Sequence, residues 1–299
     1  MTKRILLIYY SQSGQLGNIL NSFSQAFLKK DYEVEVISVI PETPFPFPWT
    51  GKSFFSIMPD CVQGRSIKLK EFKPKHQSYD LIVLGYQPWF LSPSLTSNAI
   101  LEHPNMAPIF ENTPVIAITG ARNMWMNAFE KIKTSLKAKQ ANLVGHIVLV
   151  DRNPNLISVI TILYWMFTAK RDKYLGIFPK PGVSEKDIQS CQLYGELTEK
   201  HLQSQQLETL QDDLLQHKAL QVNYNLMYTE SKAGKLFKIW ANFIDKRQNK
   251  SFWLVVFKYY LLIALFIAAP IIILLHTILV KPFISKRIYK KIKYFQGVN

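Results

Sequence analysis

The first 150 residues alternate between short apolar runs and longer segments that carry a helical apolar stripe. Four of the runs are mostly continuous: Ile5–Tyr9, Leu81–Leu84, Val115–Ile118 and Leu143–Val150. Such runs are typical of strands covered on both faces, and strands that alternate with helices favour a doubly wound parallel sheet. A fifth run, Tyr32–Val39, alternates with Glu33 and Glu35, which indicates an edge strand. We therefore expect an α/β fold with five parallel strands in the order 2-1-3-4-5, which places the second strand at an edge.

The positive charge of the chain is concentrated at one end. The 299 residues are 48% hydrophobic, which is enough for one substantial core with an appended part. The formal net charge is +15, but Ser231–Asn299 holds 13 Lys or Arg and one acidic residue, Asp245, and so carries +12. The first 230 residues carry only the remaining +3. We expect no nucleic-acid partner, because the body has no basic footprint.

The spacing of the cysteines and histidines argues against disulfide bonds and against a metal site. Cys61 and Cys191 have no partner spacing, and the six histidines do not form a metal-ligand pattern such as HxxxH. No cleavable signal peptide is visible at the N-terminus. We expect a cytoplasmic body without disulfides and without a metal site. His76, His103 and His146 fall in two loops and a strand, and none of them stands out as a general base.

The loop after the first strand combines hydroxyls, amides and glycine. It reads YYSQSGQLGN and contains Ser11, Gln12, Ser13, Gly14, Gln15 and Leu16. Ligands of a doubly wound sheet bind at the carboxyl ends of the strands, beside strands one and three, where the strand order reverses. A helix that begins near Gly17 would direct free N–H groups and its positive dipole end to this edge. We therefore predict a cradle for a terminal monophosphate, in which two serine hydroxyls donate and no fixed positive charge takes part.

This loop resembles the phosphate loop of the flavodoxin-like superfamily, which binds flavin mononucleotide (FMN). That loop typically reads Thr/Ser-x-Thr/Ser-Gly-x-Thr straight after the first strand, and Ser11, Ser13 and Gly14 match it. Leu16 departs from the pattern, and Asn18 is a candidate for the missing polar contact. The spacings GxxxxGKS/T and GxGxxG of other nucleotide-binding loops are absent. An ordinary strand-to-helix turn remains the alternative.

Two further loops leave the strand ends where the resemblance places the flavin ring. The third strand is followed by GYQPWFLSPS and the fourth by TGARNMWMNAF. The residues expected to surround the isoalloxazine are Gln87, Pro88, Trp89, Phe90, Gly120, Ala121, Arg122 and Asn123. Arg122 and Asn123 would lie near the carbonyl edge of the ring, where a donor stabilises negative charge on the reduced flavin. Trp125 has two open interpretations, a core residue or a site residue.

The resemblance to the flavodoxin-like superfamily covers residues 1–205, and two motifs within this range are similar to a smaller group of that superfamily. TGARNMW and VLVDRNPNLISVITI are similar to a group of flavodoxin-like proteins, the dialkylresorcinol condensing enzymes. In those pathways the flavodoxin-like partner is thought to oxidise an alkylated cyclohexanedione to a resorcinol, while a separate ketosynthase makes the carbon bonds. The body is not acidic, unlike the small flavodoxins that carry electrons. The Pro-rich residues 41–79 depart from the family, and the stretch PETPFPFPWTGKSFF is too rich in proline for a regular helix.

Residues 151–183 form a second insertion, which is predominantly apolar from Leu156 to Thr168. The apolar part is too short to span a bilayer. It follows the carboxyl end of the fifth strand, so we expect it to pass close to the flavin crevice. A lid, an interfacial segment and a buried helix are the three interpretations of it. Ser184, with Asp187 three residues later, would then cap a final helix.

Beyond residue 205 the alternating pattern ends. Residues 206–250 indicate a helical linker, whose last part is a basic amphipathic juxtamembrane helix. Residues 251–283 form a hydrophobic membrane segment, with 22 uncharged residues from Tyr259 to Val280, and residues 284–299 form a basic tail. Both flanks are basic and so favour the cytoplasmic side. We predict that Pro270 turns the segment into a hairpin within one leaflet, with a kinked single span as the alternative.

Together these features predict a membrane-anchored, FMN-dependent oxidoreductase with its catalytic domain in the cytoplasm. Its substrate would be a lipophilic cyclic dione, resorcinol or quinone-like compound, and NAD(P)H is a candidate reductant. The alternatives are a membrane-tethered electron-transfer module, an NAD(P)H:quinone reductase and a scaffold that has lost its flavin. A ketosynthase or a redox protein is the protein partner that the resemblance implies. Catalysis is assigned to the flavin rather than to a side chain, and the oligomeric state stays open.

Overall fold

The computed structural model describes residues 2–298 and contains the predicted five-stranded parallel sheet. The strands lie in the order β2-β1-β3-β6-β7, and every neighbouring pair is parallel. Their bounds are β1 Lys3–Tyr9, β2 Tyr32–Ser38, β3 Leu81–Gly85, β6 Pro114–Ala121 and β7 Asn142–Val150. Counted along the chain this is the order 2-1-3-4-5 of flavodoxin-like sheets, so the predicted fold class is confirmed.

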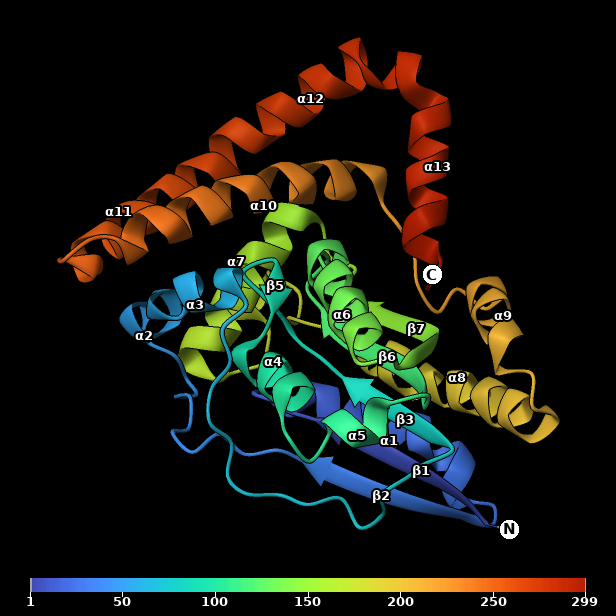
Figure 1. Cartoon of the computed structure of the whole chain (residues 1–299). Coiled ribbons are helices and arrows are strands. Elements are labelled where there is room, and N and C mark those ends of the chain that lie inside the picture. The colour runs from blue at the N-terminus through green and yellow to red at the C-terminus, as the bar shows by residue number, and fades with distance from the viewer. Residues whose placement is uncertain (1, 299) are drawn as a thin grey trace.

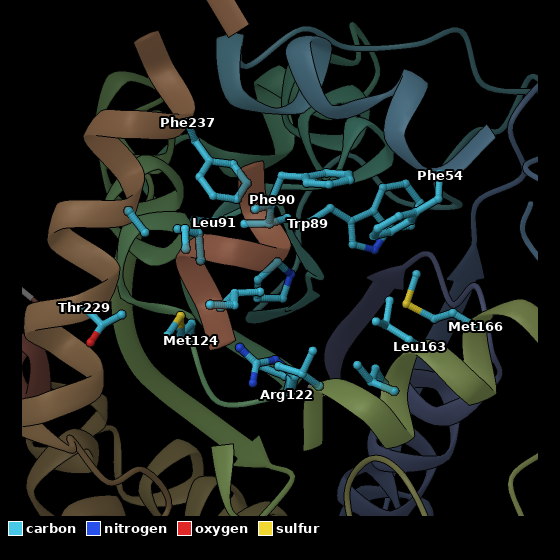
Figure 2. Close-up of a pocket in the computed structure, with 18 of the residues that line it drawn as sticks. Phe54, Trp89, Phe90, Leu91, Arg122, Met124, Leu163, Met166, Thr229 and Phe237 are labelled. Carbon is cyan, nitrogen blue, oxygen red and sulfur yellow. The ribbon is translucent and has the colours of Figure 1, made fainter. Parts of the chain in front are cut away.

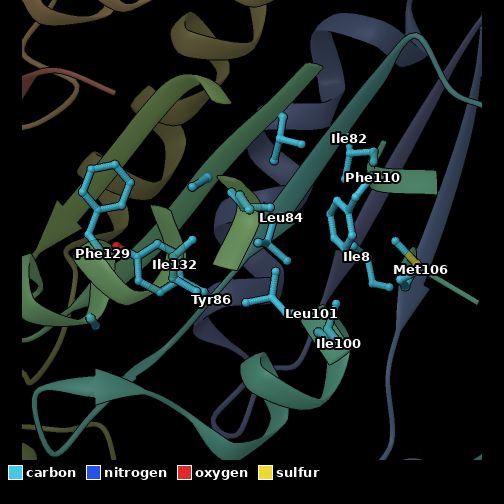
Figure 3. Packing of buried hydrophobic residues seen from close by; sticks show 14 of the residues in the cluster. Ile8, Ile82, Leu84, Tyr86, Ile100, Leu101, Met106, Phe110, Phe129 and Ile132 are labelled. Atoms are coloured by element: carbon cyan, nitrogen blue, oxygen red, sulfur yellow. The ribbon is translucent and has the colours of Figure 1, made fainter. Parts of the chain in front are cut away.

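Helices cover both faces of the sheet (Figure 1). The helices of one face are α1 (Gln15–Leu28), α8 (Glu185–Ser204) and α9 (Leu210–Gln216). The helices of the other face are α4 (Leu95–Glu102), α5 (Ala107–Phe110) and α6 (Met126–Ala138). Figure 3 shows the core between the sheet and α4, α5 and α6, where Ile82 and Leu84 of β3 lie among side chains such as Leu101 and Phe110. Both faces of each central strand are therefore buried, which explains the continuous apolar runs.

The alternating strand β2 lies at an edge of the sheet, as predicted. The end of the Pro-rich insertion covers this edge. The backbone N–H of Lys75 donates to the Glu35 carboxylate at 3.1 Å, and the Tyr79 hydroxyl donates to the same group. Glu35 is therefore buried, and its charge and the cover protect an otherwise open sheet edge.

Close packing between α1 and α8 fixes the helix that follows the first strand. Ser184 caps α8 as predicted, because its side chain accepts a hydrogen bond from the backbone N–H of Asp187. A Cβ at Gly195 would lie 2.0 Å from the carbonyl oxygen of Phe23. Any larger residue at position 195 would therefore push α8 away from α1.

The two insertions form short helices. The Pro-rich stretch is irregular up to Thr50, and the prediction that it contains no regular helix is wrong for its last residues. Its four prolines all precede the helices, and the Thr50 side chain caps the first of them. The bounds of the helices and of a small hairpin after β3 are α2 Gly51–Ser56, α3 Met58–Gln63, α7 Asn155–Thr168, β4 Pro88–Trp89 and β5 Ser92–Pro93.

Four helices follow the body, and their bounds are α10 Tyr224–Asp245, α11 Lys250–Ile263, α12 Ala269–Leu279 and α13 Ser285–Gln296. A π-helical turn, Ala264–Ala268, joins α11 to α12, so that Lys250–Leu279 is one helix of 30 residues, the long apolar helix. The predicted hairpin at Pro270 is therefore wrong. The proline lies at the start of α12, directly after the π-turn, whose altered hydrogen bonding accommodates it. Figure 1 shows α10 and the long apolar helix side by side over the body, and α13 returning to it.

Candidate functional site

The loop between β1 and α1 makes a tight turn at the carboxyl edge of the sheet. Helix α1 begins at Gln15, slightly before the predicted start, and Gly14 is its N-cap residue. Gly14 has a φ of 82° and a ψ of −20°, a left-handed conformation that glycine adopts with little strain. The backbone of the loop therefore requires the glycine that the motif predicted.

Three side chains of this loop are engaged within the protein. Ser11 Oγ accepts a hydrogen bond from the backbone N–H of Gly17 at 3.3 Å. Gln12 Nε2 donates to a carbonyl of the Pro-rich insertion at 3.0 Å. Gln15 bonds the backbone of Val183 in both directions, at 3.1 and 3.2 Å. The two glutamines therefore connect the loop to both insertions.

The free donors of the loop are Ser13 and the first N–H groups of α1. Within residues 2–298, no hydrogen bond engages Ser13 Oγ or the backbone N–H groups of Gln15 and Leu16. Leu16, where the flavodoxin-like motif has threonine, belongs to the first turn of α1, is only 2% exposed and packs in the core. Asn18 is exposed and is not among the residues that line the site. The loop thus presents a hydroxyl and two backbone donors at a helix N-terminus, an arrangement that binds phosphate.

All three predicted loops open into one cavity of about 600 Å³, a volume suited to a cofactor or substrate. The predicted residues that line it are Gln12, Ser13, Gln15, Leu16, Gln87, Pro88, Trp89, Phe90, Gly120, Ala121 and Arg122. Ser11, Gly14 and Asn123 lie outside its lining. Figure 2 shows Trp89 and Phe90 on one side of the cavity and Arg122 on another.

The β4–β5 hairpin carries Trp89 and Phe90 to the cavity. Phe90 and Leu91 form its two-residue turn, with φ values of 49° and 59°. A left-handed backbone is unfavourable for such residues by roughly 1–2 kcal/mol each, so packing must hold the turn. The Phe90 ring packs against Phe54 (centroids 4.7 Å apart) and Phe237 of α10 (6.3 Å). The turn therefore connects the loop after β3 to the Pro-rich insertion and to the C-terminal helices.

Trp89 belongs to an aromatic cluster built from three segments of the chain. Its ring lies edge-on to Tyr10 (centroids 6.4 Å apart), Phe45 (5.2 Å) and Trp49 (5.8 Å). Tyr10 follows β1, and the other two residues belong to the Pro-rich insertion. Burial raises the pKa of Tyr10 to about 12, so its hydroxyl stays protonated at neutral pH. The insertion therefore supports the aromatic wall of the cavity.

Gln87 presents a buried acceptor that has no partner within residues 2–298. Its Oε1 atom is buried, although the residue lines the cavity. Leaving such an oxygen without a hydrogen bond is unfavourable by about 1–3 kcal/mol. A ligand with an N–H group in the cavity would remove this penalty.

Arg122 places a half-buried positive charge in the cavity wall. Its Nη1 donates to Asn155 Oδ1 (2.7 Å), to the Asn155 carbonyl (3.2 Å) and to Ser158 Oγ (3.1 Å). Burial lowers the pKa of Arg122 to about 10, which leaves the guanidinium charged at neutral pH. Asn123 donates to the same Asn155 Oδ1 at 2.9 Å and so turns away from the cavity. The start of α7 therefore holds Arg122 in position.

Gly120 and Trp125 have packing roles. A Cβ at Gly120 would lie 2.7 Å from Ile19 Cδ1, so the glycine lets β6 pack closely against α1. Trp125 is 1% exposed and lies in the core against Phe129 and His146, with ring centroids 6.1 and 5.1 Å away. The structure thus favours the core interpretation of Trp125.

Helices outside the three predicted loops also line the cavity, and of these only the second insertion was expected from the sequence to pass close to it. Helix α7 forms one wall, with Leu163 and Met166 seen in Figure 2, so the second insertion lines the cavity as a partly buried helix. Helix α10 adds Thr229 and Phe237, and the long apolar helix adds a further wall. The amphipathic pattern around Phe237 predicted a membrane-surface helix, and nothing local indicated that this face covers a cavity.

A buried carboxylate, Glu230, fastens α10 to the body. Its Oε1 accepts a hydrogen bond from the backbone N–H of Asn127 at 2.7 Å, at the N-terminus of α6. Asn127 Nδ2 also donates to the Glu230 carbonyl at 2.9 Å. Burial raises the pKa of Glu230 to about 7, although the N–H groups of α6 and the charge of Arg122 oppose the rise.

Glu230 is expected to make the protein less stable as the pH rises from about 4.5 to about 7. The folded carboxyl keeps its proton up to about pH 7, whereas the unfolded one loses it near 4.5, so the unfolded state binds fewer protons in this window. The stabilisation is complete below the window and falls by roughly 3 kcal/mol across it. Thermal melts of wild type and Glu230→Gln across the window check this. A difference between the two proteins that does not change with pH would contradict it.

No protein-family model matches the sequence, and no curated protein is significantly similar to it. Several solved structures are similar to the chain. A flavoprotein from Lactobacillus acidophilus NCFM in complex with FMN has 19% identity and a TM-score of 0.40, over 49% of this chain and 93% of that chain. Flavodoxin 1 from Bacillus cereus has 16% identity and a TM-score of 0.36, over 66% and 98%. A flavone reductase has 8% identity and a TM-score of 0.36, over 67% and 63%.

Proposed function

We propose that the cavity binds FMN and that the protein is an FMN-dependent oxidoreductase. The observation that carries the proposal is the turn at Gly14, where the Ser13 hydroxyl and two free backbone N–H groups meet at the N-terminus of α1, beside the cavity. A terminal phosphate fits such a site. The unpartnered Gln87 acceptor and the aromatic wall of Trp89 and Phe90 fit a flat ring that carries an N–H group.

The side chains around the cavity suit the handling of a flavin. When bound, FMN supplies hydride transfer, and the protein positions and polarises it. Arg122 would stabilise negative charge that develops on the ring, and its bonds to Asn155 and Ser158 hold it ready for that task. Trp89 and Phe90 would exclude water from the ring.

The substrate that we propose is a lipophilic cyclic dione, resorcinol or quinone-like compound. Beyond the three loops, apolar side chains of α7 and of the long apolar helix line the cavity, among them Leu163 and Ile272. An apolar wall of this kind accommodates an alkyl chain. The resemblance to dialkylresorcinol condensing enzymes agrees with an alkylated ring, and it stays a prediction, as does a ketosynthase partner.

We also propose that the protein associates with a membrane through the long apolar helix. This helix has 30 residues, and its most apolar window of 18 residues has a mean hydropathy of 2.7, and only 6% of that window is buried. That is long and apolar enough to enter a bilayer. The cytoplasmic position of the body stays a prediction.

A membrane-tethered electron-transfer module is the second candidate function. Electron exchange between proteins is favoured by a ring edge that a partner can approach. Here Phe237 of α10 and residues of the long apolar helix line the cavity that the three loops open into, which favours a small-molecule reaction. NAD(P)H, as in an NAD(P)H:quinone reductase, or a redox protein stays the predicted source of electrons.

Purified full-length protein is expected to carry FMN, identified by its mass after release. Ser13→Ala should weaken FMN affinity by roughly 10- to 150-fold, because a hydrogen bond to a charged group contributes about 1.5–3 kcal/mol. Calorimetric titration of the flavin-free protein with FMN measures this.

The matched control is Ser22→Ala. Ser22 lies within α1, its Oγ donates to the Gln189 carbonyl at 3.1 Å and it does not line the cavity, so FMN affinity should stay at the wild-type value. Wild-type affinity in Ser13→Ala would contradict the phosphate site, and failure of the wild type to bind FMN would overturn the proposed function.

A further inference from the structure

The outer face of the long apolar helix is a continuous apolar stripe. Side chains at helical spacing along it are each at least half exposed, for example Val255, Tyr259, Ile263, Ile267, Ile271 and Leu274. The stripe continues over both α11 and α12. An exposed apolar surface of this extent marks an interaction site.

The inner face of the same helix is attached to α10 at two separate places. Near its start, Phe257 packs against Phe237 and Trp240, with centroids 5.3 and 5.6 Å apart. Near its end, His276 stacks on Tyr228 at 3.8 Å. The helix therefore lies lengthwise along α10 instead of leaving the body.

The chain after the long apolar helix returns to the body. Tyr294 Oη of α13 donates to Glu130 Oε2 on α6 at 2.6 Å, and Gln211 Nε2 donates to the Gln296 carbonyl at 2.7 Å. A helix of 30 residues is about 45 Å long, longer than a hydrocarbon core of about 30 Å. Because both of its ends are joined to one body, a transverse span would pull one set of these contacts through the bilayer.

Basic residues flank both ends of the long apolar helix. The residues at its start are Lys246, Arg247 and Lys250, and those at its end are Lys281, Lys286 and Arg287. The charge of Ser231–Asn299 is +12, as counted above. A surface that combines an apolar stripe with this charge complements the interface of an anionic bilayer.

The cavity reaches the surface beside the stripe. Between the two attachments, Ala264 and Ala268 of the inner face line the cavity, and their small size leaves space between the helix and α10. Ile263 and Ile272 also line it although they are 58% and 50% exposed. A path therefore runs from the three loops to the apolar surface of the molecule.

We propose that the protein docks on an anionic phospholipid bilayer with the long apolar helix parallel to the membrane plane, and that lipophilic molecules enter the cavity sideways from the acyl chains. The outer stripe lies among the acyl chains, the flanking basic residues contact phosphate head groups, and the body and α13 stay on one side. The entry route rests on the proposed function, whereas the docking geometry does not.

Depth-dependent quenching tests the geometry in the full-length protein. Cys61 and Cys191 are buried, so a single cysteine at Val255, Ile267 or Ile278 can carry a fluorophore selectively. In vesicles of phosphatidylcholine and phosphatidylglycerol that contain spin-labelled lipids, we expect the same shallow depth at all three positions. A label at Leu193 on α8 should not be quenched.

A transverse helix would give a different result. Val255 and Ile278 lie about 35 Å apart along the helix axis, so they would approach opposite surfaces while Ile267 lay near the bilayer centre. That profile, or no quenching at any position, would overturn the docking geometry. The measurement needs no flavin, so it stands whether or not FMN binds.

Charge removal from the protein tests the basic flanks. Lys281→Gln with Lys286→Gln should weaken binding to phosphatidylglycerol vesicles by roughly 30-fold, at about fivefold per lysine. Lys186→Gln with Lys200→Gln on α8 removes the same charge elsewhere and should leave binding unchanged. Equal losses in both variants would contradict specific contact by the flanks.

The entry route is tested with the outer stripe, which lies outside the cavity lining at Ile267 and Ile271. Ile267→Asp with Ile271→Asp should detach the protein and lower turnover of a long-chain quinone held in vesicles by at least ~10-fold. Turnover of a short water-soluble quinone should not change. Equal turnover of the vesicle-bound quinone by wild type and variant would overturn the route and leave the depth profile as a separate result.

Discussion

Replacing Gly14 with valine is expected to abolish flavin binding. Gly14 has a φ of 82°, and a β-branched residue is strongly disfavoured in that conformation. Among residues 2–298, no atom outside the glycine and its two chain neighbours lies within 4 Å of a Cβ built there, so the obstacle is the backbone and not a clash. The loop would relax to a different φ and carry Ser13 and the first N–H groups of α1 out of position. The ratio of FMN to protein after purification with added FMN measures the loss.

Two variants separate this effect from general destabilisation. Gly14→Asn should keep most of the flavin, because asparagine tolerates the left-handed region. Gly176→Val introduces similar strain at a φ of 71° in an open position away from the cavity, and it should bind FMN normally. Full FMN loading of Gly14→Val would show that the turn does not hold the phosphate.

Arg122→Met is expected to lower turnover by roughly 10²–10³-fold and to make the flavin harder to reduce. A cation held beside the ring stabilises the negative charge of reduced flavin, and removing one such preorganised group typically has an effect of this size. Methionine keeps much of the length and the apolar contacts of the arginine stem. Turnover with a quinone and the reduction potential of the bound flavin measure the two effects.

Two control variants separate the effect of the Arg122 charge from the effect of the side chain that positions it. Arg122→Lys keeps the charge and should retain most of the potential. Asn155→Ala keeps the arginine but removes the side chain that binds it at 2.7 Å, so it should lower turnover less than Arg122→Met does. An unchanged flavin potential in folded Arg122→Met would contradict the proposed position of this charge beside the ring.

The strands and the convergence of the three loops could be predicted from the sequence. The run Leu81–Leu84 is apolar throughout because a central parallel strand is buried on both faces, and all four residues are buried. The carboxyl ends of parallel strands meet at one edge, so the loops that contain Ser13, Gln87 and Arg122 had to lie together. The structure places all three residues in the lining of one cavity.

The hydrogen-bond partners of individual polar side chains could not be predicted in the same way. Gln12 and Gln15 look like ligand donors in the sequence, but their partners are backbone groups of the two insertions, 34 and 168 residues away. Asn123 was expected to face the flavin together with Arg122, but it donates to Asn155 Oδ1, which Arg122 also binds, and it lies outside the cavity lining. A hydrogen-bond partner that distant is decided by packing, because local sequence does not specify which remote carbonyl will be within reach.

The sequence by itself determined the α/β class, the strand order, the glycine turn at Gly14 and the existence of a long apolar segment, because backbone conformation and burial on two faces restrict residue types locally. Only the tertiary structure decided how that helix is used. The 22 uncharged residues from Tyr259 to Val280 have the same composition whether they cross a bilayer, form a hairpin or lie along a protein surface. The contacts of Phe257, His276 and Tyr294 with distant parts of the chain place both ends of the helix on one body, and composition carries no information about such contacts.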